Sequence, residues 1–295
     1  MSPAEPAKPT ATSPLVRTLL FALLVLFGVS FVIPFVWQVM ISLSDRSEVD
    51  LIAYLGAPPT VHPENYAKVF TGAGIEGSEK LAQRVDFARS FFNSFFVAGW
   101  VTLLQIVTCS MSAYAFSRIR WPGRDKVFLL YLATLMVPGV VLIVPNFVII
   151  LRLGMFDDYT GLIIPAAFSA YGTFLLRQFM LTIPSSLDEA AAIDGAGHWR
   201  IFTQVILPLT RPGIIVLAIF AFLFNYNSFF WPLIITKSPN LRVLPIALQA
   251  FDSSYGRETP LIMAASLLAM IPPIILFLLL QKYLVRGIQL GAVKG

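Results

Sequence analysis

The sequence predicts an all-α integral membrane protein with six transmembrane helices and a cytoplasmic elbow between the fourth and fifth helices. Of the 295 residues, 57% are hydrophobic and 13% are charged, whereas soluble domains carry about 25% charged residues. Six long stretches contain no Asp, Glu, Lys or Arg. A helix needs ~20 mostly apolar residues to cross a bilayer, and these stretches lack the alternation of barrel strands. The bilayer is therefore the expected solvent for much of the chain.

The predicted elements follow from these uncharged stretches. The spans are 18–44, 90–117, 127–151, 159–176, 212–236 and 259–281. The first stretch is longer than the apolar core of a signal peptide, so we expect it to be a permanent anchor. Around the spans we expect a proline-rich, disordered N-terminus over 1–17, an external loop over 45–89, a five-helix domain over 90–285 and a tail over 286–295. Prolines within the spans predict kinks at Pro138, Pro145, Pro165, Pro232 and Pro272–Pro273.

Orientation follows from the basic residues of the second connection. Residues 117–126 carry Arg118, Arg120, Arg124 and Lys126. Because short loops rich in Lys and Arg stay inside, this connection, both termini and the segment between the fourth and fifth spans are expected to be cytoplasmic.

The spans lack residues that several function classes use. They contain no Asp, Glu, Lys or Arg that could serve as a proton relay or charged ring, which argues against an ion-coupled carrier or a charge-ringed channel. One cysteine, Cys109, allows no internal disulfide, and two distant histidines, His62 and His198, provide no metal cluster. The net charge of +5 is spread along the chain, which argues against nucleic acid as a partner. No G-x-x-x-x-G-K-[ST] motif is present, so the chain binds no ATP in a loop of that kind and needs an external motor.

The elbow at 185–208 is the most specific local signal. Ser186 and Glu189 fit a capping box, and Gly195 and Gly197 can break the helix that follows. A second short helix should then run until Pro208 ends it. Three alanines, 190–192, would let another backbone approach closely. The segment is either a helix that docks on a partner or one that lies on the membrane surface.

A resemblance bears on this choice. Glu189-Ala190-Ala191, then Gly195, then Val205 and Leu207-Pro208 resemble the EAA signature of bacterial ABC-importer permeases, with valine where the family usually has isoleucine. Phe92-Asn93-Ser94 and the C-terminal stretch 285–295 are similar to the carbohydrate branch, close to maltose-type permeases. The resemblance implies an ABC transmembrane permease domain over 90–285 in a bacterial inner membrane, with the elbow as a coupling helix. The ATPase-coupling residues would be Glu189, Ala190, Ala191, Gly195, Val205, Leu207 and Pro208.

The same resemblance implies partners. They are a separate ABC ATPase dimer that binds ATP and Mg, a second permease subunit that we expect to be non-identical, and an extracytoplasmic solute-binding protein. The chain itself would bind no cofactor and catalyse no reaction.

A polar cluster in the fifth span is a candidate solute path: Asn225, Tyr226, Asn227 and Ser228. On a continuous helix, Asn225 and Ser228 share one face, and Asn227 and Trp231 share another. The family often has Trp-Asn followed by an acidic residue here, which this sequence lacks. The cluster either contacts solute or forms hydrogen bonds between helices. Further polar candidates are Gln105, Asn146 and Gln178.

Two functions remain at this point. The first is a permease subunit of an ATP-driven importer, which forms half of the path for a sugar or related polyol. The second is a self-contained secondary carrier or channel for a small polar solute. A membrane enzyme would need a His, Cys or carboxylate cluster in the spans, and none is present in the sequence.

Overall fold

The computed structural model describes residues 13–50, 52, 60–71, 86–253 and 259–292, and every regular element within these ranges is a helix. The longest are α1 (Pro14–Ser42), α5 (Phe87–Ser117), α13 (Arg211–Tyr226) and α16 (Thr259–Ala292). The shorter α-helices before the elbow are α3 (Glu64–Thr71), α6 (Arg124–Ala133), α7 (Ile143–Arg152), α8 (Tyr159–Ile163) and α9 (Ala170–Leu181). The elbow and the segments after it form α10 (Ser186–Ile193), α11 (His198–Ile201), α12 (Leu207–Leu209), α14 (Phe230–Ile235) and α15 (Leu244–Ser253). The all-α prediction is confirmed for the described residues.

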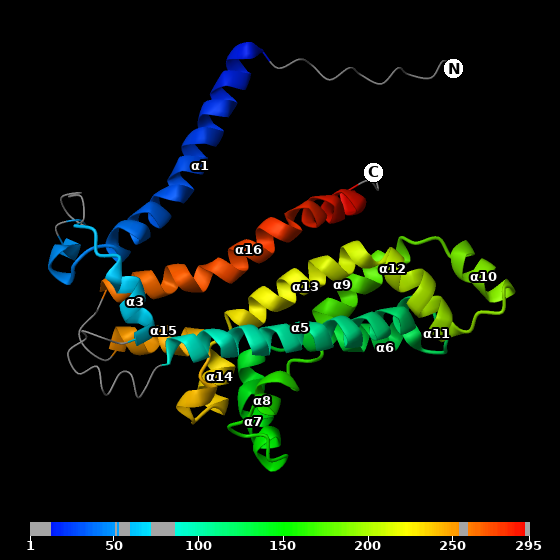
Figure 1. Cartoon of the computed structure of the whole chain (residues 1–295). Coiled ribbons are helices and arrows are strands. Elements are labelled where there is room, and N and C mark those ends of the chain that lie inside the picture. Colours follow the sequence, from blue (N-terminus) through cyan, green and yellow to red (C-terminus); the bar gives the residue numbers. More distant parts are fainter. Residues whose placement is uncertain (1–12, 51, 53–59, 72–85, 254–258, 293–295) are drawn as a thin grey trace.

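Helix α5 is the central element of the bundle. Three clusters of buried apolar side chains hold the fold together, and α5 contributes to each. Phe87 and Ala98 pack with α13, α15 and α16, Ala113 packs with α9 and the elbow, and Val101 packs with α7, α8 and α14. Figure 1 shows α5 running along the bundle, with α10 and α11 at one end and α3 and α15 at the other.

Helix α1 lies mostly outside this bundle. None of the residues in its most apolar window is buried, and it meets the rest of the fold at its C-terminal part (Figure 1). It begins at Pro14, with the Ser13 hydroxyl accepting a hydrogen bond from the Val16 amide at 3.4 Å. Residues 14–17, which we expected to be disordered, are therefore helical because Ser13 and Pro14 suit a helix start. Residues 1–12 lie outside the described residues.

Among the described residues, three helices are long and apolar enough to cross a membrane: α1, α5 and Thr259–Lys282 of α16. Two bent pairs raise the number to five if each is counted as one span, Arg124–Arg152 with a bend of 91° and His198–Tyr226 with a bend of 76°. The stretch predicted as the fourth span is absent from this set, so the described helices do not by themselves reproduce six continuous spans.

The third predicted span is broken at Pro138. Val137, the residue before it, is extended with ψ 117°, as the proline ring requires. The chain resumes as a 3-10 turn over Gly139–Leu142 and then as α7. Pro145 lies inside the first turn of α7, where its missing N–H costs no hydrogen bond. Of the two prolines, only Pro138 breaks the helix.

The fourth predicted span is two short helices, α8 and α9, joined by an irregular segment over 164–169 that contains Pro165. Side chains of α5 satisfy the carbonyls of this segment. Gln105 donates to the Ala166 carbonyl and Thr108 to the Ala167 carbonyl, both at 2.7 Å. Backbone at membrane depth can be irregular only where protein or water supplies its hydrogen bonds, and here α5 supplies them.

The fifth predicted span is also interrupted. α13 ends at Tyr226, and α14 begins at Phe230 with Pro232 in its first turn. A continuous helix would bring the Pro232 ring against the carbonyl of residue 228, which explains the break. By contrast, α16 continues as a helix through Pro272 and Pro273.

The connections at the α3 end are tied together by side chains. Asp157, with φ 58°, accepts hydrogen bonds from the Lys237 amide (2.8 Å) and from the amide and hydroxyl of Ser238. Asn93 is fully buried and donates to the carbonyls of Asn240 and Arg242 at 2.8 and 2.9 Å. These bonds fix the connection after α14 against α5 and α8.

Candidate functional site

The elbow projects from one end of the bundle as two short helices. Figure 1 shows α10 and α11 beyond the ends of α5, α9 and α13. No residue of α10 is buried among the described residues. A helix without a buried face gains little from packing within its own chain.

Gly195 makes the turn between these two helices. Its φ is +80°, a left-handed conformation that glycine adopts easily and that costs energy for residues with a Cβ. Gly197 is extended, with φ −74°, and precedes α11. The two glycines thus separate α10 from α11, as the sequence predicts.

Two details of the predicted elbow are wrong. The N-cap of α10 is Ser185 in a helical conformation, and no side chain caps the helix, so Ser186 and Glu189 do not form a capping box. The helical stretch also does not end at Pro208. A π-helical turn over Phe202–Ile206 precedes α12, and the chain bends by 76° around Thr210. The wider π turn accommodates a proline that has no N–H to donate.

The seven predicted coupling residues divide into two groups. Ala191, Val205 and Leu207 are half-buried and pack on the apolar cluster of α5, α9 and α13. The other four are exposed: Glu189, Ala190, Gly195 and Pro208. The first group attaches the elbow to the bundle, and the second group faces outward.

Large apolar side chains surround the exposed group. Ile193 is 86% exposed, Trp199 66% and Leu187 41%. Exposed apolar side chains grouped on a charged, glycine-hinged segment are typical of a surface that binds another protein. These three residues, together with Ala190, are called the elbow face below.

Arg118, immediately after α5, anchors the elbow. The sequence did not predict it as a site residue. Its guanidinium forms an ion pair with Asp188 of α10 at 2.7 Å and donates to the carbonyls of Met180 and Ile183. Only 8% of the Arg118 side chain and 22% of the Asp188 side chain are exposed. From the sequence, this arginine indicated only which side of the membrane the connection faces. Its burial could not be predicted, because it depends on contacts with residues 60 to 70 positions away in the chain.

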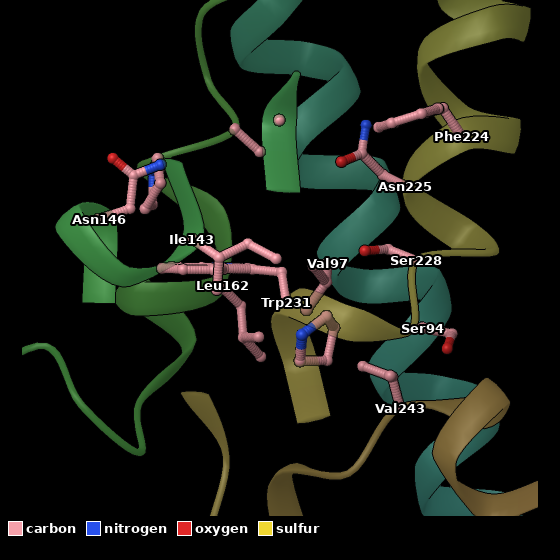
Figure 2. A pocket seen from close by; sticks show the side chains of 14 residues that line it. Ser94, Val97, Ile143, Asn146, Leu162, Phe224, Asn225, Ser228, Trp231 and Val243 are labelled. Carbon is pink, nitrogen blue, oxygen red and sulfur yellow. The ribbon is translucent and has the colours of Figure 1, made fainter. Parts of the chain in front are cut away.

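A cavity of about 220 Å³ lies between α5, α7 and the break between α13 and α14. Figure 2 shows Asn225 and Ser228 on one side of it and Asn146 on the other, with Trp231 between them. The Asn225 amide nitrogen donates to the Ala221 carbonyl at 2.7 Å, which leaves its side-chain oxygen facing the cavity (Figure 2). The indole N–H of Trp231 donates to the Gly161 carbonyl at 3.0 Å and so fixes the ring in the cavity wall.

The four polar residues predicted in the fifth span do not act together. Tyr226 is buried away from the cavity lining and donates its hydroxyl to the Ala269 carbonyl of α16 at 3.0 Å. Asn227 is exposed and donates to the Leu223 carbonyl of its own helix. The predicted pairing of Asn227 with Trp231 on one face is wrong, because the helix ends at Tyr226 and Trp231 joins Asn225 and Ser228 instead. Of the further candidates, Asn146 lines the cavity, Gln105 bonds backbone, and Gln178 is exposed.

Ser94 and Asn93 close the α3 side of this region. The Ser94 hydroxyl accepts a hydrogen bond from the Leu244 amide at 2.8 Å and also lines the cavity. The Asn93 side-chain oxygen accepts a hydrogen bond from the Tyr159 hydroxyl at 2.7 Å. Asn93 and Ser94 of the predicted Phe92-Asn93-Ser94 motif thus hold the connection after α14 in place.

Broken apolar helices, a largely apolar cavity with four polar side chains in its lining, and an outward-facing elbow at one end are the features expected of a helical membrane transport subunit. The family of binding-protein-dependent transport system inner membrane components matches residues 106–290. The chain belongs to this family and is a permease subunit of an ABC importer.

Curated relatives agree with this family. The chain is 40% identical over 204 residues to the sn-glycerol-3-phosphate transport system permease protein UgpE of Yersinia enterocolitica, covering 68% of this chain and 73% of the relative. It is 33% identical over 238 residues to the arabinooligosaccharides transport system permease protein AraQ of Halalkalibacterium halodurans, covering 81% of each.

Among solved structures, a chain from the crystal structure of a bacterial ABC transporter involved in import of the acidic polysaccharide alginate matches with a TM-score of 0.78. The match has 22% identity and covers 94% of this chain and 99% of that chain. A chain from the alginate transporter in complex with an alginate pentasaccharide-bound periplasmic protein matches with a TM-score of 0.58 and 16% identity, covering 90% and 94%. These likenesses show the fold.

Proposed function

We propose that this chain forms half of the translocation path of an ATP-driven importer for a sugar or related polyol. The observation that carries the proposal is the elbow face, in which Leu187, Ala190 and Ile193 are exposed on α10, a helix with no buried residue, and Trp199 is exposed on α11. An ABC ATPase dimer binds this face, with ATP and Mg held at the ATPase. The permease subunit itself catalyses no reaction.

The six-span topology and its orientation belong to this proposal. The six crossings of the bacterial inner membrane would be α1, α5, the bent pair Arg124–Arg152, the α8–α9 segment, α13 together with α14, and α16. The ion pair between Arg118 and Asp188 supports a common side for the basic connection and the elbow, because it joins them directly. With that side cytoplasmic, both termini are cytoplasmic too.

The solute class is supported by the cavity and by the relatives. Asparagine and serine side chains offer donors and acceptors for hydroxyl groups, and Trp231 offers an aromatic surface for the apolar face of a sugar ring. The two relatives described above are permease proteins of transport systems for sn-glycerol-3-phosphate and for arabinooligosaccharides. At about 220 Å³ the cavity is smaller than a complete ligand pocket of about 300–1,000 Å³, which fits one wall of a site shared with a second, non-identical permease subunit. A solute-binding protein delivers solute at the opposite end, where α3 and α15 lie.

The first experiment tests the elbow face. Ala190→Arg adds a long charged side chain to the exposed face of α10, and copurification of the ATPase from native membranes should be lost. Ala67→Arg is the matched control, because Ala67 is an exposed position on an eight-residue helix at the other end of the molecule. An ATPase that copurifies equally with both variants would argue against the docking surface. Uptake by the chain alone, driven by a gradient and indifferent to ATP, would support a secondary carrier instead.

The second experiment tests the cavity. Asn225→Ala should raise the solute concentration needed for half-maximal uptake while the ATPase still copurifies. Asn227→Ala is the matched control, because this neighbouring asparagine lies outside the cavity lining. Equal effects of the two substitutions would contradict a solute path along Asn225.

A further inference from the structure

Arg118 joins three elements that the chain connects only partly. The arginine directly follows α5, and its guanidinium bonds the carbonyls of Met180 and Ile183 at the end of α9 and the Asp188 carboxylate in α10. The elbow is linked covalently to α9 and, through α12, to α13. It has no covalent link to α5, so Arg118 provides a direct connection between the elbow and the central helix.

This connection reaches the cavity through a rigid element. The other part of α5 carries Ser94 and Val97, which line the cavity. Val97 and Arg118 are separated by roughly 30 Å of helix at 1.5 Å per residue. A displacement of α10 that is passed to Arg118 is therefore passed along α5 to the cavity wall.

The burial of this ion pair makes it a weak source of stability by itself. Arg118 Nε and Asp188 Oδ1 are buried and have no hydrogen-bond partner among the described residues. Buried ion pairs stabilise a fold only when their remaining polar atoms are also satisfied.

We propose that Arg118 is a positioning residue that couples movement of the elbow to α5, and hence to the solute cavity, through its bonds to Asp188 and to the end of α9. The inference rests on the proposed function, because it assumes that an ATPase moves the elbow. It adds a polar route of coupling beside the covalent links through α9 and α13 and the apolar packing of the elbow on α5.

The test uses the complete transporter reconstituted in liposomes with its ATPase and binding protein. The variants are Arg118→Gln, Asp188→Asn and the double variant. Arg120→Gln is the matched control, since Arg120 is exposed, lies two residues away and forms no ion pair with any described residue. Three quantities are measured: ATPase copurification, ATP hydrolysis with and without the solute-loaded binding protein, and solute uptake.

Both single variants should retain the ATPase and its basal hydrolysis. Stimulation by the solute-loaded binding protein and uptake should fall about ten-fold, in the range of energetic coupling through such contacts. The double variant should be no worse than Arg118→Gln, because both substitutions remove one interaction. Arg120→Gln should behave like the wild type.

Other outcomes overturn the inference. Normal stimulation in both Arg118→Gln and Asp188→Asn would show that the covalent links and the apolar packing of the elbow suffice. Loss of the ATPase from both variants would show that the pair serves docking or folding rather than coupling. Asp188→Asn keeps the side-chain shape, so it remains informative if Arg118→Gln fails to fold. If the wild-type chain itself captures no ATPase, the proposed function fails, and the coupling role fails with it.

Discussion

Gly195 offers the sharpest test of the elbow, because its replacement separates backbone strain from side-chain size. Its φ is +80°, and a Cβ added there would meet nothing within 4 Å. Gly195→Ala therefore introduces no clash and costs only the left-handed conformation, about 1–2 kcal/mol. Because Gly195 is exposed and no residue of α10 is buried, this strain should relax locally and leave the melting temperature of the chain almost unchanged.

The effect should appear in the affinity for the ATPase. If binding requires the turn seen here, 1–2 kcal/mol of strain weakens binding by about 5- to 30-fold. The assay titrates the purified ATPase against the permease complex in lipid nanodiscs. Gly195→Asn should lose less, because asparagine tolerates the left-handed region better than alanine.

Gly197→Ala is the matched control for this prediction. Gly197 also has nothing within 4 Å of an added Cβ, but its φ of −74° suits any residue. It should bind the ATPase as the wild type does. Equal losses in Gly195→Ala and Gly197→Ala, or no loss in either, would refute the reasoning from backbone strain.

Three further predictions concern stability, each measured by thermal unfolding in detergent. Asn93→Leu removes three hydrogen bonds of a fully buried side chain and should cost about 1–3 kcal/mol for each buried group left unsatisfied; an unchanged melting temperature would contradict it. Burial raises the pKa of Asp157, but the hydrogen bonds from the connection after α14 outweigh it and hold the pKa below its ordinary value. The carboxylate therefore stabilises the fold above about pH 4, and this contribution is lost as the pH falls through the lowered pKa; the difference in melting temperature between wild type and Asp157→Asn should shrink below about pH 4, and a constant difference would refute it. Gly213→Ala places a Cβ 2.6 Å from Cγ of Phe179 and should destabilise by about 1–3 kcal/mol, whereas Gly99→Ala, with nothing within 4 Å, should not, so equal melting temperatures for the two variants would count against overpacking.

Hydropathy predicted the class of protein but not the continuity of its helices. A charge-free stretch reports that its side chains tolerate lipid, and it carries no information on whether its backbone hydrogen bonds are local. The break at 164–169 depends on Gln105 and Thr108, which approach from another helix. The break after Tyr226 likewise moves Trp231 to the cavity, which a regular helical period could not foresee.

The elbow was more predictable than its attachment. Gly195 indicates a turn from its residue type alone, and the alanines and glutamate of α10 follow the family signature. Arg118 has no comparable local signal, because a basic residue after a span is expected for topological reasons alone. Its partner Asp188 likewise has no local feature that indicates the ion pair. Ion pairs between residues so far apart in the sequence can be identified only from the folded structure.

The exposed tryptophan and isoleucine of the elbow have a consequence for biogenesis. A copy of this chain made without its ATPase would expose Ile193 and Trp199 to water as an uncovered apolar surface. Surplus copies would then tend to aggregate and to be degraded by proteases. Balanced synthesis of the subunits, or their prompt assembly after insertion, would keep that patch hidden.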